Sequence, residues 1–151
     1  MTCPVTGLTE EMFDNIPNMR SRFHKIRASS SRTTLIADDI FLAHTQTVIL
    51  SLDLMVKVLY NPSKLKKKLL LVAKSHVGRN PPVGSDYFDP FADNFHFFMQ
   101  STLGLPEDDP EVQAWAKFLY VLSDLVRTEE VALAKQNKTT VHHNAPCCHI
   151  L

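Results

Sequence analysis

The chain has 151 residues, of which 44% are hydrophobic and 21% are charged, as is usual for a single globular domain. Sixteen basic residues balance sixteen acidic ones, so no overall electric field attracts nucleic acid or an anionic membrane. We interpret the one dense basic cluster as the solvated face of a helix, with a phosphate or lipid patch as the less favoured alternative. The cluster consists of Lys64, Lys66, Lys67 and Lys68.

Targeting and membrane-spanning segments are not expected. The start of the chain, MTCPVTGLTEEMFD, has neither the basic nor the apolar region of a signal peptide. The longest apolar segments are interrupted by charge or proline, which argues against a membrane span. Cys3, Cys147 and Cys148 match neither a zinc site nor a disulfide framework. The sequence therefore predicts a cytoplasmic protein.

The last residues contain a weak lipidation motif. Cys148-His149-Ile150-Leu151 loosely fits the prenylation pattern, and Cys147 would be a palmitoylation site. The histidine in this motif and the lack of adjacent lysines weaken the match. Because one lipid chain anchors a protein only weakly, we expect membrane association only if both cysteines are modified. The alternative is a plain exposed tail with oxidisable thiols.

Four helices are predicted, separated by proline and glycine. The first spans roughly 35–60, and the second begins after Ser63 as N-cap and ends at Gly78 in a left-handed C-cap. The third begins near Asp89-Pro90, and the fourth follows GLPEDDP with an acidic first turn. No alternating stretch is long enough for a strand. The sequence therefore predicts an all-α domain over residues 1–136 and a polar, disordered tail over 137–151.

Each predicted helix has an apolar stripe in which residues recur at steps of three or four, with a few wider steps. The stripes face the core of the predicted domain, and two of them include a histidine. In chain order they are Phe41, His44, Val48, Leu52, Met55 and Leu59; then Leu65, Leu69, Val72 and His76; then Phe88, Phe91, Phe95, Phe98 and Leu103; and finally Val112, Trp115, Leu119, Leu122 and Val126.

His44 and His76 therefore sit on the inner faces of two separate helices. If those helices pack across one cavity, two imidazoles face each other in apolar surroundings, and each unpaired ring costs a few kcal/mol of desolvation. An apolar cofactor that carries a metal would remove this cost, because one imidazole would bind the iron and the other would face its open side. The alternative is a helical interaction domain in which both histidines are core residues.

The order of these residues resembles that of the globin family over roughly residues 12–130. In globins a phenylalanine that stacks on the haem follows a proline, as Phe23 follows Pro17. His44 comes 21 residues after Phe23, where globins place the distal histidine, and an aliphatic residue follows it at Val48. His76 comes 32 residues after His44, at the position of the proximal histidine. The EVQAWAKFLYVL segment with Trp115 resembles the start of the last globin helix.

This resemblance implies a globin-like fold with haem b as the cofactor and His76 as the proximal iron ligand. The other ring nitrogen of His76 would donate to Ser75 or to a backbone carbonyl. His44 would be the distal residue, hydrogen-bonding the bound gas or coordinating the iron as a sixth ligand. The implied partner is a diatomic gas, oxygen or else NO or CO, bound reversibly for transport, storage or sensing. The implied haem-contacting residues are Phe23, His44, Val48, Val72, His76, Phe88 and Phe91.

The resemblance also implies departures from the family. Globins carry a longer segment before the position of Phe13, so their first helix and much of the second are expected to be missing or reduced here, with Thr9 near the distal pocket. The RNPPVGSD linker is longer than usual, and Arg79 would contact a haem propionate or remain solvated.

An enzymatic function is not expected. Nitric oxide scavenging or a weak peroxidase activity would need an electron source or a distal acid and base. The sequence contains no flavin or nicotinamide motif, and no arginine accompanies His44 on the distal side. We retain a redox or nitric oxide-scavenging haem protein as an alternative function, with any such catalysis as a side activity.

Overall fold

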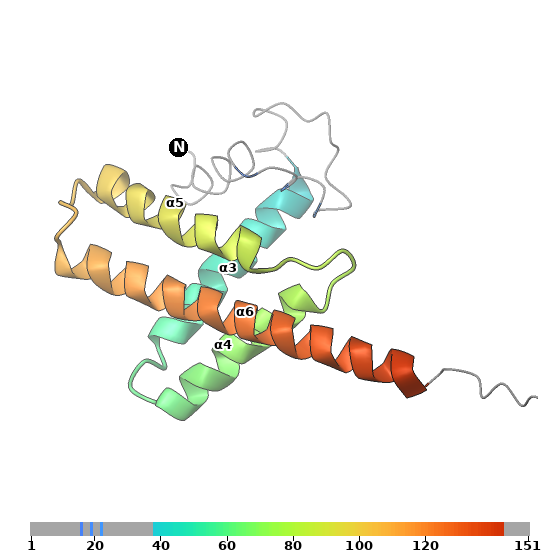
Figure 1. Cartoon of the computed structure of the whole chain (residues 1–151). Coiled ribbons are helices and arrows are strands. Elements are labelled where there is room, and N and C mark those ends of the chain that lie inside the picture. The colour runs from blue at the N-terminus through green and yellow to red at the C-terminus, as the bar shows by residue number, and fades with distance from the viewer. Residues whose placement is uncertain (1–15, 17–18, 20–21, 23–37, 144–151) are drawn as a thin grey trace, which may run out of the picture.

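The computed structural model describes residues 16, 19, 22 and 38–143, with side chains up to residue 137. The described segment contains four helices and no strand, which confirms the all-α prediction. Figure 1 shows α5 and α6 side by side, with α4 on the other side of α6, and α6 packs against both α4 and α5. The helices are α3 (Asp39–Val56), α4 (Pro62–Val77), α5 (Ser85–Leu103) and α6 (Pro110–His143).

Side-chain caps fix where α3 and α4 begin. The Asp38 carboxylate accepts hydrogen bonds from the amides of Ile40 and Phe41 at 2.9 and 3.0 Å, which satisfies two free N–H groups of α3. The Asn61 side chain accepts from the Lys64 amide at 3.0 Å, and proline occupies the first position of α4. Proline suits that position because its missing N–H would have had no helical partner.

The end of α4 at Gly78 is confirmed, but its predicted N-cap residue and the predicted left-handed conformation of Gly78 are wrong. The cap is Asn61 and not Ser63, because Pro62 can already adopt helical geometry and the asparagine precedes it. Gly78 follows α4 with φ of −75°, so it is not a left-handed cap. The backbone there is instead held by a hydrogen bond from the Gly78 amide to the Lys74 carbonyl at 2.9 Å.

The start of α5 also differs from the prediction. The helix begins at Ser85, four residues before the predicted Asp89-Pro90, and Pro90 lies inside it. Its first turn is capped from another helix: the Glu130 carboxylate of α6 accepts from the Ser85 amide at 3.1 Å and from the Ser85 hydroxyl at 2.7 Å. A Cβ on Gly84 would lie 1.7 Å from the same carboxylate, so this interhelical cap requires glycine.

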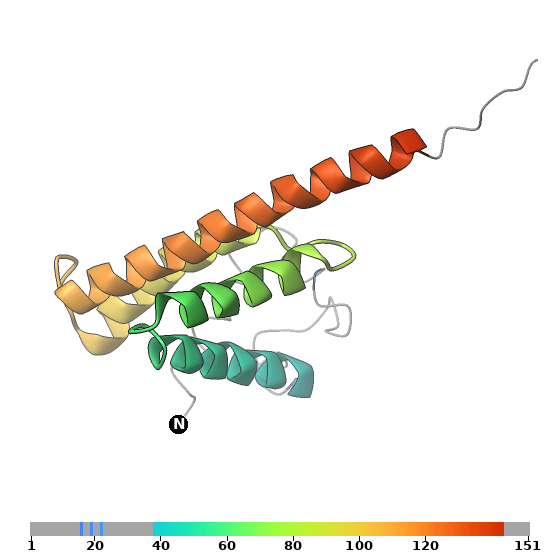
Figure 2. The same cartoon turned by 90° about the horizontal axis from the view of Figure 1, so that it is seen from below.

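α3 and α6 each end at a different residue from the one predicted. α3 ends at Val56 rather than near residue 60. α6 continues to His143, so residues 137–143 of the predicted disordered tail are helical. Figure 2 shows this end of α6 projecting beyond the other helices. Residues 144–151, with the lipidation motif, lie outside the described residues, as do most of residues 1–37.

The expectation that no segment could span a membrane needs correction for α3. By length and composition α3 is a candidate span, with a mean hydropathy of 1.3. Its charges lie near its two ends, at Asp39 and Asp53, so they do not interrupt the apolar middle. In the structure α3 is one helix of the folded bundle and buries Phe41, Thr45 and Met55.

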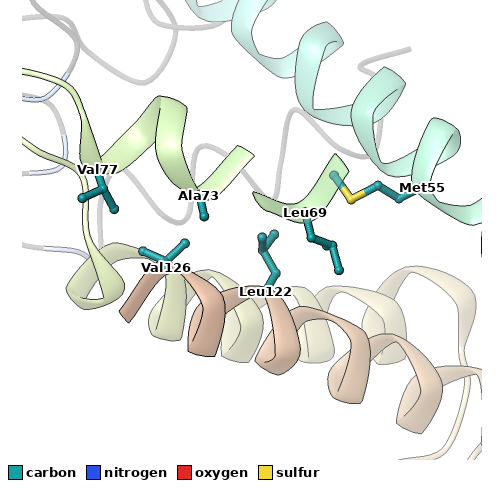
Figure 3. Packing of buried hydrophobic residues seen from close by; sticks show 6 residues of the cluster. All are labelled: Met55, Leu69, Ala73, Val77, Leu122 and Val126. Carbon is teal, nitrogen blue, oxygen red and sulfur yellow. The ribbon is translucent and has the colours of Figure 1, made fainter. Parts of the chain in front are cut away.

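The core forms where α3, α4 and α6 meet and continues between α5 and α6. Figure 3 shows Met55 of α3 and the side chains of α4 and α6 directed into one cluster. Leu59 and Leu103 were expected to face the core but are 50% and 54% exposed, because one lies beyond the end of α3 and the other is the last residue of α5. The cluster in Figure 3 consists of Met55, Leu69, Ala73, Val77, Leu122 and Val126.

We expect Glu130→Ala to lower the free energy of unfolding by about 1–2 kcal/mol, because it leaves the first turn of α5 without its cap. Urea unfolding followed by circular dichroism measures this change. Glu129→Ala, which alters the adjacent glutamate, is the matched control. Equal effects of the two substitutions would contradict the interhelical cap.

Candidate functional site

His76 lies at the end of α4 with one ring nitrogen already engaged. Its Nδ1 is 2.8 Å from the Val72 carbonyl oxygen. A carbonyl can only accept, so Nδ1 carries the proton and Nε2 keeps its lone pair. The Ser75 hydroxyl donates to the same carbonyl at 2.8 Å and lies 3.3 Å from Nδ1. The expected backbone partner of His76 is thereby identified, and its Nε2 is the atom available to a metal.

The loop after α4 and the first turns of α5 hold His76 in place. The His76 carbonyl accepts hydrogen bonds from the amides of Arg79 and Val83, at 3.2 and 3.1 Å. The Phe88 ring meets the imidazole edge to face, with centroids 5.1 Å apart and planes at 89°. The RNPPVGSD segment therefore folds back on α4, and the ring orientation is set from two sides.

His44 lies on α3 within the electrostatic reach of His76. Burial lowers the pKa of His44, the charges of His76 and Arg79 act in the same direction, and together they bring it to about 4. The pKa of His76 is also lowered by burial, although its hydrogen bond to Val72 acts in the opposite sense. At neutral pH both imidazoles are therefore uncharged. The charge of His76 influences the pKa of His44, as expected for two histidines on neighbouring helices.

The other predicted contact residues fall into two groups. Val48 and Val72 are half-buried on the same helices as the two histidines, and Phe88 and Phe91 are half-buried on α5. Both phenylalanines pack against the buried cluster that contains Phe41. Phe23, together with Pro17, Thr9 and His24, lies outside the described residues, so its expected contact with a cofactor remains a prediction.

Two further basic residues have different surroundings. Arg79 is exposed, and its charge lowers the pKa of both histidines, which places it electrostatically beside the pair. His96 is half-buried, and its ring contacts the ring of the adjacent Phe97 with centroids 6.0 Å apart. The positive charge of Arg79 therefore acts on both histidines, and His96 belongs to the α5 surface.

Sequence reasoning missed three residues near the site. The buried Tyr87 accepts a hydrogen bond from Arg22 Nε at 2.5 Å, and the Arg22 guanidinium lies 4.9 Å from its ring centroid. This pair spans 65 residues, and no local pattern indicates it. Thr45, next to His44, buries a hydroxyl that has no hydrogen-bond partner among the described residues. A threonine on an otherwise apolar stripe was the only available signal.

We expect the stability of the apoprotein to fall as the pH falls from about 6.5 toward 4. Between these values the unfolded chain binds a proton at His44 that the folded chain does not, so protonation favours unfolding. Above about pH 6.5 the term is constant. His44→Leu should reduce the slope of unfolding free energy against pH. The free energy of unfolding that is lost over this range should be smaller in the variant by up to about 3 kcal/mol. Urea unfolding at several pH values tests this, and an unchanged slope would contradict burial of His44.

Comparisons with known proteins identify the family and the fold. The family model described as globin matches residues 7–126. A globin from Biomphalaria glabrata is 33% identical over 116 residues, covering 77% of this chain and 76% of that protein. A double mutant of myoglobin from Aplysia limacina matches the structure with a TM-score of 0.71 at 23% identity, covering 83% of this chain and 82% of that one. The family match and the fold it shares with this myoglobin lead to one conclusion: the chain belongs to the globin family.

Proposed function

We propose that this globin binds haem through His76 and binds oxygen or another diatomic gas reversibly, with His44 on the distal side. The observation that carries the proposal is the hydrogen bond from His76 Nδ1 to the Val72 carbonyl. It fixes the tautomer whose Nε2 lone pair can bind iron, and it increases the basicity of that nitrogen. Membership of the globin family supports oxygen binding as the general role.

The described residues fit a haem group. Haem needs one strong nitrogen ligand from the protein and apolar surroundings for the macrocycle. His76 provides the nitrogen, and Val48, Val72 and Phe91 are apolar side chains on the three helices concerned. Arg79 provides a positive charge close to both histidines, as a propionate would require. When bound, haem supplies an iron centre that holds oxygen, NO or CO reversibly.

The two histidines have different tasks in this proposal. His76 would hold the iron of bound haem, with its ring orientation kept by Val72 and Phe88. His44 is uncharged at neutral pH, so its imidazole has one N–H to donate and one lone pair. It can therefore donate a hydrogen bond to a polar gas ligand, which slows dissociation, or coordinate the iron in the absence of gas. The apolar side chains exclude water and so limit oxidation of the iron.

His76→Gly should abolish the five-coordinate histidine spectrum of the haem-reconstituted ferrous protein, because Nε2 is the proposed iron ligand. Added imidazole should restore that spectrum by occupying the space of the missing ring, which also shows that the variant has folded. Absorption spectra in the ferrous and ferric states are the measurement. Absence of a Soret band in the reconstituted wild type would overturn the proposal.

His44→Leu should leave haem binding intact and raise the gas dissociation rate about tenfold to a hundredfold, the equivalent of one lost hydrogen bond. Flash photolysis or stopped-flow mixing measures this rate. If His44 coordinates the resting iron, the same variant converts a six-coordinate ferrous spectrum to a five-coordinate one. Loss of the proximal spectrum in His44→Leu, with its retention in His76→Gly, would reverse the two assignments.

A further inference from the structure

The balanced overall charge conceals a strong separation of charge along the chain. Residues 54–85 contain six lysines and Arg79 and no acidic residue, whereas residues 86–111 contain seven acidic residues and no lysine or arginine. The basic block contains α4, and the acidic block contains most of α5 and the loop that follows it. Figure 1 shows α4 and α5 on different sides of α6, so among the described helices the basic and the acidic block lie apart.

One face of α4 concentrates the basic block. Lys64, Lys67, Leu71 and Lys74 follow each other at steps of three and four, so they share one face of the helix. All four are exposed, and the opposite face buries Leu69, Ala73 and Val77. Figure 2 shows α4 in front of α5, between α6 and α3. We call these four exposed residues the basic face of α4.

The charges of the lysines on the basic face are not neutralised by ion pairs among the described residues. None of them forms an ion pair with another residue in the segment 38–137; the ion pairs there are Lys57 with Asp53, and Arg127 with Asp89 and Asp124. Lys64 lies in the first turn of α4, at the positive end of the helix dipole, and this turn contains no acidic residue that could balance its charge. The mutual repulsion of these charges would be relieved by an anionic surface outside the molecule.

Apolar side chains project among the same lysines. Leu71 is 70% exposed in the middle of the basic face. Leu59 and Tyr60, in the turn that leads into α4, are 50% and 81% exposed. A free polyanion without apolar groups would need only the charges. Lysines around leucine and tyrosine instead match the interfacial region of a bilayer, where the charges meet headgroups and the apolar groups enter the acyl boundary.

We propose that the basic face of α4, together with Leu59 and Tyr60, is a docking surface for anionic phospholipid membranes. The protein lies on the bilayer with α4 parallel to its plane, and the acidic side formed by α5 faces away from it. This orientation is favoured because anionic lipids attract the lysines and repel the carboxylates. The inference does not depend on haem or gas binding, since none of these residues takes part in the proposed site.

Co-sedimentation of the full chain with vesicles tests this surface. We expect binding to phosphatidylcholine vesicles that contain about 30% phosphatidylserine, little binding to phosphatidylcholine alone, and loss of binding at about 0.5 M salt. Lys64→Gln with Lys67→Gln should weaken binding about 25-fold, at about fivefold per lysine. Lys117→Gln with Lys135→Gln, which changes the same charge on α6, is the matched control and should leave binding almost unchanged.

Leu71→Ser separates lipid docking from general attraction to anions. It changes no charge and alters a side chain that contributes nothing to the core, so we expect it to weaken vesicle binding about fivefold while leaving folding intact. Equal binding to both kinds of vesicle, or equal losses in the two lysine pairs, would overturn the proposal. A third outcome would also overturn it: the wild type binds polyglutamate as tightly as the anionic vesicles, and Leu71→Ser has no effect. The surface would then be a site for acidic polymers.

Discussion

The hydrogen bond between the His76 ring and the Val72 carbonyl is the constraint on which the candidate site depends. Histidine near the end of a helix has several rotamers and two neutral tautomers, and this bond selects one of each. Everything else in the site follows from the direction in which Nε2 is then held. The helix end is in turn fixed because the His76 carbonyl accepts two amides from the following loop. A single hydrogen bond to the backbone therefore determines which ring nitrogen of His76 is available to a metal.

The site and the basic face use different parts of α4 without conflict. His76 lies in the last turn and faces the interior, whereas Lys64 and Lys67 lie near the first turn and face outward. A helix with a period of 3.6 residues can keep these two sides separate over sixteen residues. A substitution on one side can therefore be tested without changing the other side, so the two proposals can be tested independently.

Periodicity predicted the parts of the structure that are locally encoded. The four helices and the inward stripe with Leu119 and Val126 required only the spacing of apolar residues. The start of α5 could not be predicted in this way, because its cap, Glu130, comes from 45 residues away. Tyr87 with Arg22 is a second contact of this kind. Sequence patterns report local preferences, whereas these contacts exist only after the helices have packed.

The interhelical cap has a consequence for the cooperativity of the fold. Because the first turn of α5 is completed by Glu130, we expect α5 and the middle of α6 to open together in hydrogen exchange. Phe88 lies in that first turn and contacts the His76 ring. A fluctuation that frays α6 around Glu130 would therefore reach the imidazole through two contacts. The long last helix, although distant in sequence from His76, thus helps to determine how rigidly the ring is held.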